Sequence, residues 1–244
     1  MKKLMKFTVA DLRNIVRDPM QTMTAVAPLI IIVVIRIFLS VAREQVIQFF
    51  DYDIISDYPM IISFFSLLIP MMVGLVIGFI ILDERDESMI NYYAVTPLTK
   101  KGYLVFRMTV PIVFTFLVSV VFYLSLYDIY AVDLLKLLIV SSLLALQAPV
   151  FSFLMASFAS NKVEGLAIGK LLGMMIVPPI ANYFLVSNWS LLFFIVPQTW
   201  VSAIITGKNI GFLNLPMIVS LSLFIHVAII IFCIKTFMKK VDGS

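Results

Sequence analysis

The sequence predicts an all-α polytopic membrane protein, one transmembrane domain built from six membrane-spanning helices. Of its 244 residues, 62% are hydrophobic and only 13% are charged, whereas an average soluble domain is about 45–50% apolar and about 25% charged. The mean hydropathy of +1.08 reflects an apolar excess spread along the whole chain. A soluble core of this length could not hide so much apolar surface. Soluble enzymes, nucleic-acid-binding proteins and disordered scaffolds therefore fit the composition poorly.

Each predicted span is an apolar run of about 20 residues, the length that crosses about 30 Å of hydrocarbon. The runs cover residues 22–42, 60–82, 102–127, 137–160, 165–186 and 215–234. The fifth is the hardest to delimit, because residues 171–207 carry no charge and Pro178-Pro179 interrupts them. We therefore expect residues 191–206 to form a short re-entrant or interfacial helix within an extracellular segment, residues 187–214.

The basic residues orient these spans. With six spans and both termini inside, the inner segments hold 14 of the 18 lysines and arginines, in agreement with the positive-inside rule. A seventh span at residues 191–206 would place the basic C-terminal tail outside. We therefore expect a multi-pass protein of the cell (plasma) membrane with cytoplasmic termini.

The first 19 residues predict an amphipathic helix. Four apolar residues recur at intervals of four, three and four positions and so share one helix face. They are Met5, Val9, Leu12 and Val16. Asp18-Pro19 ends the helix, because a residue before proline avoids the α conformation. Basic residues on the other faces, together with Arg17, favour a helix lying in the inner membrane interface; a cap over the other helices is the alternative.

The loop between the second and third spans, residues 83–101, is the longest polar segment between spans that is predicted to be cytoplasmic. It begins with Asp83, Glu84, Asp86 and Glu87. Acids at the start and lysines beyond the end predict a short helix that starts near Asp83 and stops at Pro97. Ile90, Tyr92 and Tyr93 would project from the membrane, and an apolar patch with a charged rim is typical of a docking surface. A charged spacer is the alternative.

The chain resembles the permease subunits of type-two ABC (ATP-binding-cassette) exporters, and the resemblance covers nearly its whole length. Four features carry it: the N-terminal helix ending in Arg17-Asp18-Pro19, the loop with Glu84, Glu87 and Thr96-Pro97-Leu98-Thr99, the connection SNKVEGLAIGK, and Pro197-Gln198-Thr199-Trp200 before the last span. The resemblance implies that Asp83–Thr99 is the coupling helix seated in a groove of an ATPase. One departure is Ser88-Met89-Ile90, where many relatives have Gly-Thr-Leu.

The resemblance also implies the partners and the division of labour. Two permease subunits, identical or homologous, would share the translocation pathway in a bacterial membrane, with two cytoplasmic ATPase subunits docked beneath. ATP and magnesium would be bound by the ATPase, since no Walker A motif occurs among the nine glycines here. This chain would be no enzyme, would bind no cofactor or metal, and would export a hydrophobic or amphipathic molecule (a drug, peptide or lipid) or an ion. A stand-alone channel or sensory protein is the alternative.

Polar residues inside the predicted spans need a reason, because a charge at mid-bilayer is costly. The candidates for lining the pathway are Arg36, Gln147, Asn182 and His226. Arg36 has two interpretations: it pairs with a loop acid near the outer interface, or it lines the pathway. Arg107 and Lys170 lie within two turns of the inner boundary, where their long side chains can reach the interface.

Three glycines at the start of the fifth span form a small-residue stripe. Gly165, Gly169 and Gly173 recur every four residues, which allows another helix to approach closely. We expect tight helix packing there, within the chain or across a dimer.

Overall fold

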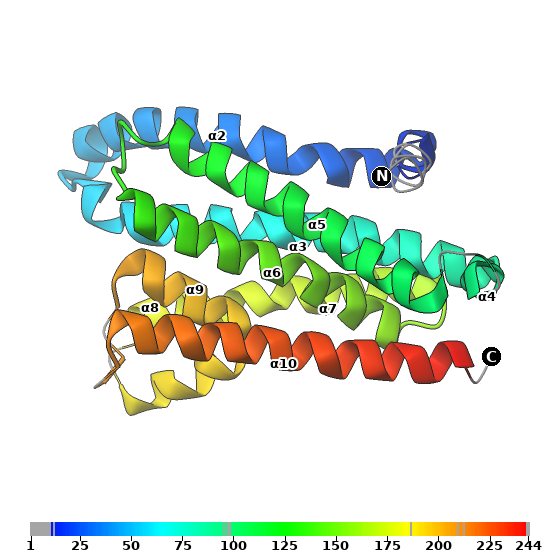
Figure 1. The fold of residues 1–244 in the computed structure, drawn as a ribbon. Coiled ribbons are helices and arrows are strands. Elements are labelled where there is room, and N and C mark those ends of the chain that lie inside the picture. The colour runs from blue at the N-terminus through cyan, green and yellow to red at the C-terminus, as the bar shows by residue number, and fades with distance from the viewer. Residues whose placement is uncertain are drawn as a thin grey trace.

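The computed structural model is a bundle of long helices lying side by side (Figure 1). It describes residues 11, 13–94, 96, 99–185, 187–208, 210–211 and 213–242, and this described part of the chain contains helices but no β-strand. Six segments are long and apolar enough to cross a membrane: Pro19–Phe50, Ile54–Asp86, Thr99–Ser125, Leu134–Phe158, Lys162–Phe184 and Leu215–Val241. The predicted fold class is confirmed.

In chain order the elements are α2 (Pro19–Phe50), η1 (Ile54–Asp57), α3 (Tyr58–Asp86), α4 (Met89–Ala94), α5 (Thr99–Ser125), α6 (Leu134–Phe158), α7 (Lys162–Gly173), η2 (Met174–Ile176), α8 (Val177–Phe184), η3 (Asn188–Ile195), α9 (Pro197–Thr206) and α10 (Leu215–Asp242). Both termini and α4 lie at one end of the bundle, and α8 and α9 lie at the other (Figure 1). These are called the α4 end and the α9 end.

Helices α3 and α6 form the centre of the bundle. In each of them 72% of the most apolar 18-residue stretch is buried, whereas the corresponding share in the other four spanning segments is 17% to 33%. The two helices touch at Gly74, where an added Cβ would lie 2.5 Å from both the Ala148 carbonyl oxygen and the Phe151 Cβ. Only a glycine fits at this contact, so the sequence allows the close approach.

The fifth spanning segment, Lys162–Phe184, is interrupted just before Pro178-Pro179. It consists of α7, a single 3-10 turn (η2) and α8. Pro178 and Pro179 sit in the first turn of α8, and because proline lacks an N–H donor the carbonyls of the preceding turn lose their usual partners. The tightened turn η2 lies at that point.

The chain between the fifth span and α10 forms two short helices, η3 and α9, with a sharp bend between them. The 3-10 helix η3 meets α9 at 119°, which fits the predicted re-entrant segment or a broken span. Trp200 fixes the bend, because its indole N–H donates to the Phe194 carbonyl at 2.7 Å. Residues 197–205 of α9 are all buried, so this short helix is part of the core at the α9 end.

Candidate functional site at the α4 end

Arg107 of α5 lies at the centre of a buried ion cluster. Its guanidinium donates to both carboxylate oxygens of Asp11 at 2.6 and 3.0 Å and, through Nε, to Glu84 of α3 at 2.9 Å. The Tyr103 hydroxyl also donates to Glu84, at 2.8 Å. Only 1% of the Arg107 side chain is exposed. The cluster therefore joins the N-terminal segment, α3 and α5. The Arg107 side chain was expected to extend to the membrane interface, and in the structure it is instead paired with Asp11 and Glu84.

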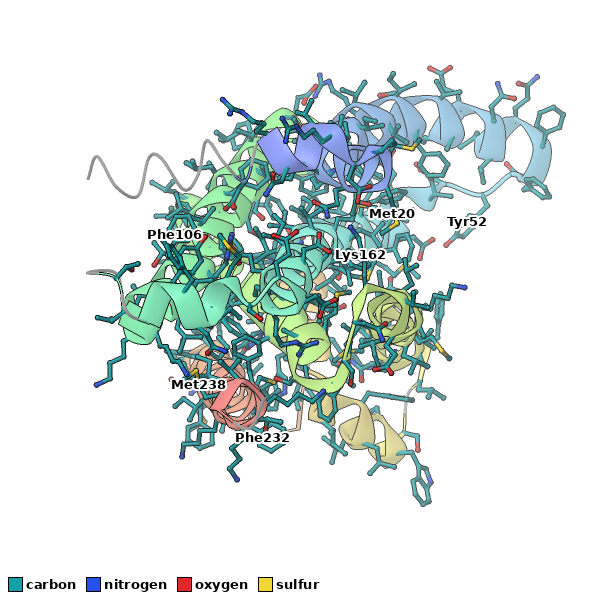
Figure 2. All side chains as sticks on the ribbon, turned by 90° about the vertical axis from the view of Figure 1, so that its right-hand side faces the viewer. Met20, Tyr52, Phe106, Lys162, Phe232 and Met238 are labelled. Atoms are coloured by element: carbon teal, nitrogen blue, oxygen red, sulfur yellow. The ribbon has the colours of Figure 1, made fainter. Side chains whose placement is uncertain are left out.

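Lys162, the first residue of α7, forms a second cluster beside the first. Its ammonium group binds Asp18 at 2.9 Å and Asp83 at 3.2 Å, and the Gln21 amide also donates to Asp83, at 3.2 Å. Asp18 caps α2 by accepting from the backbone N–H of Met20, and the Lys162 hydrogen bond lowers the pKa of this carboxyl. Figure 2 views the bundle from this end and places Lys162 near its centre.

The two clusters use neighbouring residues of one helix. Asp83 and Glu84 are consecutive in α3, so their side chains leave the helix about 100° apart and reach different partners. Asp83 is bonded to α7 and the start of α2, whereas Glu84 accepts from Tyr103 and Arg107 of α5. The end of α3 therefore ties together α2, α5 and α7.

The short helix predicted to start near Asp83 begins later in the structure. Helix α3 continues to Asp86, a turn follows in which Ser88 has a φ of 57°, and α4 begins at Met89. The sequence-based start was wrong because the bonds to Asp83 and Glu84 hold both residues in α3. Pro97, the predicted stop, lies outside the described residues.

Helix α4 has one face on the bundle and one face in the open. Ile90 is 2% exposed, and the Tyr93 ring stacks on Tyr103 with centroids 5.7 Å apart; burial raises the pKa of the Tyr93 hydroxyl. On the other face, Tyr92 is 62% exposed. Thr96, after the helix, donates through its hydroxyl to the Tyr93 carbonyl at 2.8 Å.

The predicted coupling residues therefore fall into two groups. Asp83, Glu84, Ile90 and Tyr93 bind or pack within the chain. Asp86 at the end of α3, Glu87 in the following turn and Tyr92 of α4 are exposed. These three residues together are called the α4 outer face below. A docking partner would contact the α4 outer face, while Ile90 and Tyr93 pack α4 against α3 and α5.

A polar cavity of about 280 Å³ lies between the clusters and the solvent. Its lining includes Arg17, Asp18, Asp83, Glu87 and Lys162. Glu84 also lines it, so the lining holds four carboxylates and the two basic side chains of Arg17 and Lys162. Among the described residues, no group of three or more His, Cys, Asp or Glu side chains is arranged to hold a metal ion, so the cavity is a mixed-charge surface.

The predicted N-terminal helix is described only in its last turns. Residues 13–17 are helical, with Val16 and Arg17 exposed, and the segment ends at Asp18 and Pro19. Met5, Val9 and Leu12 lie outside the described residues. Asp11 is a site residue that was not predicted, although an arginine in an apolar span, Arg107, signals that a carboxylate partner must exist.

The four pathway candidates come from four different helices, α2, α6, α8 and α10. Arg36 binds the Asp128 carboxylate at 2.8 and 2.9 Å and also the Ser125 carbonyl, which supports the loop-acid interpretation. Asn182 is buried in α8, and its backbone carbonyl accepts a hydrogen bond from the Lys208 ammonium group.

Gln147 and His226 are fully buried between helices of the same chain. The His226 Nδ1 contacts the Ser222 carbonyl at 2.7 Å. Within the described part of the chain, the Gln147 amide and the His226 Nε2 have no hydrogen-bond partner. Their role in a pathway stays a prediction.

The glycine stripe packs within the chain over most of its length. An added Cβ at Gly165 would lie 2.6 Å from Leu82, and one at Gly169 would lie 3.5 Å from Leu75. Gly173 has no described atom within 4 Å of that position. Close packing of α7 on α3 therefore requires the glycine at Gly165, whereas at Gly169 an added Cβ would make only ordinary van der Waals contacts.

Comparison with known proteins gives one consistent result. Residues 11–234 match the family described as "Fluoroquinolones export permease protein Rv2686c-like". Two curated relatives, the "Fluoroquinolones export permease protein" MT2760 and its counterpart Rv2686c from two strains of Mycobacterium tuberculosis, are each 31% identical over 204 residues. The alignment covers 82% of this chain and 81% of each relative. No solved structure matches the chain significantly.

Proposed function

This chain belongs to the Rv2686c-like family of export permeases, and from that membership we propose that it is the membrane subunit of an ATP-driven ABC exporter. In this proposal two permease subunits form the pathway, and a separate ATPase dimer binds ATP and magnesium. The α4 end is cytoplasmic, as the distribution of basic residues predicts.

The observation that carries the coupling role is the bonding of α4 and its flanking residues to the helices behind them. A lever must transmit force without bending. Helix α4 is held by the Tyr93–Tyr103 stack and by the buried Ile90, and the end of α3 before it is held by the ion pairs of Asp83 and Glu84. Movement of the ATPase against the α4 outer face would therefore displace α3 and α5 together. The Lys162 cluster would pass the same displacement to α2 and α7.

The substrate proposal follows from the relatives and from the composition of the bundle. Both curated relatives are named as exporters of fluoroquinolones, which are flat, amphipathic aromatic acids. We propose amphipathic drugs of this kind as the substrate class. An open apolar groove of about 550 Å³, lined by Met23, Val26, Ile30 and Met72 among others, is a surface on which such a molecule could lie.

The test is co-purification in mild detergent. The tagged chain, expressed in its native host, should carry a stoichiometric ATPase whose activity rises with added fluoroquinolone. Replacing the α4 outer face (Asp86→Lys, Glu87→Lys and Tyr92→Ala) should remove the ATPase. Glu44→Lys, which reverses an exposed acid in the half of α2 toward the α9 end, is the matched control. Export by a preparation free of any ATPase would contradict the proposal.

A further inference from the structure

Lys170 of α7 is a charged residue about two helical turns inside the membrane-spanning segment Lys162–Phe184. It lies eight residues beyond Lys162, which is about 12 Å along a helix that rises about 1.5 Å per residue. The residues of α3 give a second measure of this depth. An added Cβ on Gly169, the neighbour of Lys170, would lie 3.5 Å from Leu75. Leu75 precedes Asp83, the partner of Lys162, by eight residues. Two helices therefore give Lys170 the same depth.

The charge of Lys170 is not neutralised by any residue in the described part of the chain. The other basic residues at comparable positions are paired: Arg36 with Asp128, and Arg107 with Asp11. Lys170 is exposed, and no hydrogen-bond or ion-pair partner of it occurs among the residues that the structure describes.

A second copy of the chain could not supply the missing carboxylate at this depth. The acidic residues of the six spanning segments are Glu44, Asp57, Asp83, Glu84, Asp86 and Glu164. Each lies within six residues of an end of its segment, whereas Lys170 is eight residues from one end of Lys162–Phe184 and fourteen from the other. Packing against a partner subunit would therefore bury the ammonium group without an opposite charge, which is unfavourable.

The surroundings of Lys170 on α7 are apolar. Val163, Leu166, Leu171 and Met174 are all exposed large hydrophobic residues of the same segment. Ionisable residues inside membrane segments almost always face the protein interior or a water-filled cavity and mark solute pathways. The exposed side of α7 at Lys170 is therefore expected to line a pathway and not to face lipid.

An apolar surface lies at the same depth on α2 and α3. Helices α2 and α7 both start at the Asp18–Lys162 ion pair and run toward the α9 end (Figure 1). Ala27, nine residues beyond Asp18, lines the 550 Å³ groove with Met72 of α3. A lysine without a described partner and an apolar groove thus lie at the same depth of the bundle, and α3 contributes to the groove and also packs on α7.

We propose that Lys170 binds the carboxylate of the exported molecule while its apolar body lies on the groove of α2 and α3. This inference rests on the proposed export function and names the chemical feature that the pathway recognises. It predicts that an aromatic acid is preferred over its uncharged carboxamide.

The first experiment measures binding, because binding does not depend on coupling to ATP hydrolysis. A fluorescent quinolone carboxylic acid and its carboxamide are titrated into the purified complex. Lys170→Gln should weaken binding of the acid about tenfold, as expected for loss of a charge-assisted hydrogen bond, and leave the carboxamide unchanged. Lys170→Arg should retain the preference. Lys235→Gln is the matched control, an exposed lysine near the α4 end of α10.

ATP-driven transport of the same two compounds by reconstituted complex then separates the two proposals. Binding that depends on Lys170 without transport would contradict the export function and keep the inference. Transport of the acid with an acid-to-carboxamide ratio that Lys170→Gln does not change would overturn the inference and keep the export function. Absence of acid binding by the wild-type complex would also overturn it.

A third measurement tests whether the position meets water. A Lys170→Cys variant in a Cys233→Ala background should react with a negatively charged, membrane-impermeant thiol reagent. Failure to react would place the position in lipid, with the lysine reaching back to the interface, and would overturn the inference.

Discussion

Arg107 of α5 and Glu84 of α3 form a charge pair inside the α4 end of the bundle, with 1% and 13% of their side chains exposed. Asp11 completes the arrangement from the other side of the guanidinium. Two carboxylates around one arginine leave a net negative cluster, which the Tyr103 hydroxyl further stabilises. A buried arrangement of this kind tolerates loss of any one member poorly.

Arg107→Ala should therefore destabilise the protein strongly. Removing the guanidinium leaves Asp11 and Glu84 buried without a counter-charge, and breaking such a pair costs about 3–5 kcal/mol. The measurement is the free energy of unfolding in detergent, followed by circular dichroism. Arg13→Ala, at an exposed arginine, is the control and should change stability by less than about 0.5 kcal/mol. Equal effects of the two variants would mean that the cluster contributes nothing.

The two adjacent tyrosines of α4 should behave differently. Tyr93→Ala removes a buried ring that stacks on Tyr103 and should cost about 3–5 kcal/mol of stability, as large-to-small core changes do. Tyr92→Ala removes an exposed ring and should leave stability unchanged while it weakens ATPase binding. Thermal unfolding and co-purification of the ATPase check the two expectations. Loss of stability in Tyr92→Ala alone would reverse the assignment of faces.

Two glycine-to-alanine substitutions should have different effects on stability. Gly74→Ala places a methyl group 2.5 Å from the Ala148 carbonyl oxygen and the Phe151 Cβ, and overpacking of this kind costs about 1–3 kcal/mol. Gly173→Ala meets no described atom within 4 Å and has ordinary helical torsions, so it should be neutral or stabilise by up to about 1 kcal/mol. Denaturation midpoints of both variants test this; a destabilised Gly173→Ala would indicate a contact with another subunit.

The Arg36–Asp128 pair should make stability depend on pH. The hydrogen bond from Arg36 lowers the pKa of the Asp128 carboxyl below its ordinary value of 3.8. A lowered folded-state pKa contributes stability above pH 3.8 that is lost as the pH falls through the folded value. Wild type and Asp128→Asn should therefore differ in thermal midpoint at pH 7 and converge below pH 3.8. A constant difference over that range would show that the pair does not titrate as described.

The architecture was largely predictable from the sequence, because burial in a membrane requires long runs of apolar residues. Those runs predicted six spans, and the structure has six candidate spanning segments. The segment at residues 191–206 was predicted to be a short re-entrant or interfacial helix, because a seventh span would place the basic C-terminal tail outside, and the structure has the bent pair η3 and α9 there. Hydropathy is a local property, so it can be read from the chain directly.

The partners of the charged residues were decided only by the tertiary structure. Nothing local distinguishes Asp83 and Glu84 from Asp86 and Glu87, yet the first two are bonded inside the bundle and the last two are exposed. The difference depends on Lys162 and Arg107, which approach from helices far away in the chain. Helical periodicity gives the direction of each side chain but not the identity of the neighbour in that direction.

The same reason explains how the sequence determined the chemistry of the intramembrane charges but not their roles. The sequence alone established that Arg36, Arg107 and Lys170 each need a counter-charge or water, because hydrocarbon solvates neither arginine nor lysine. Only the packed helices showed that Arg36 and Arg107 have carboxylate partners and that Lys170 is exposed. Whether a buried charge is structural or available to a solute is decided by the distances between helices, which no single segment of sequence contains.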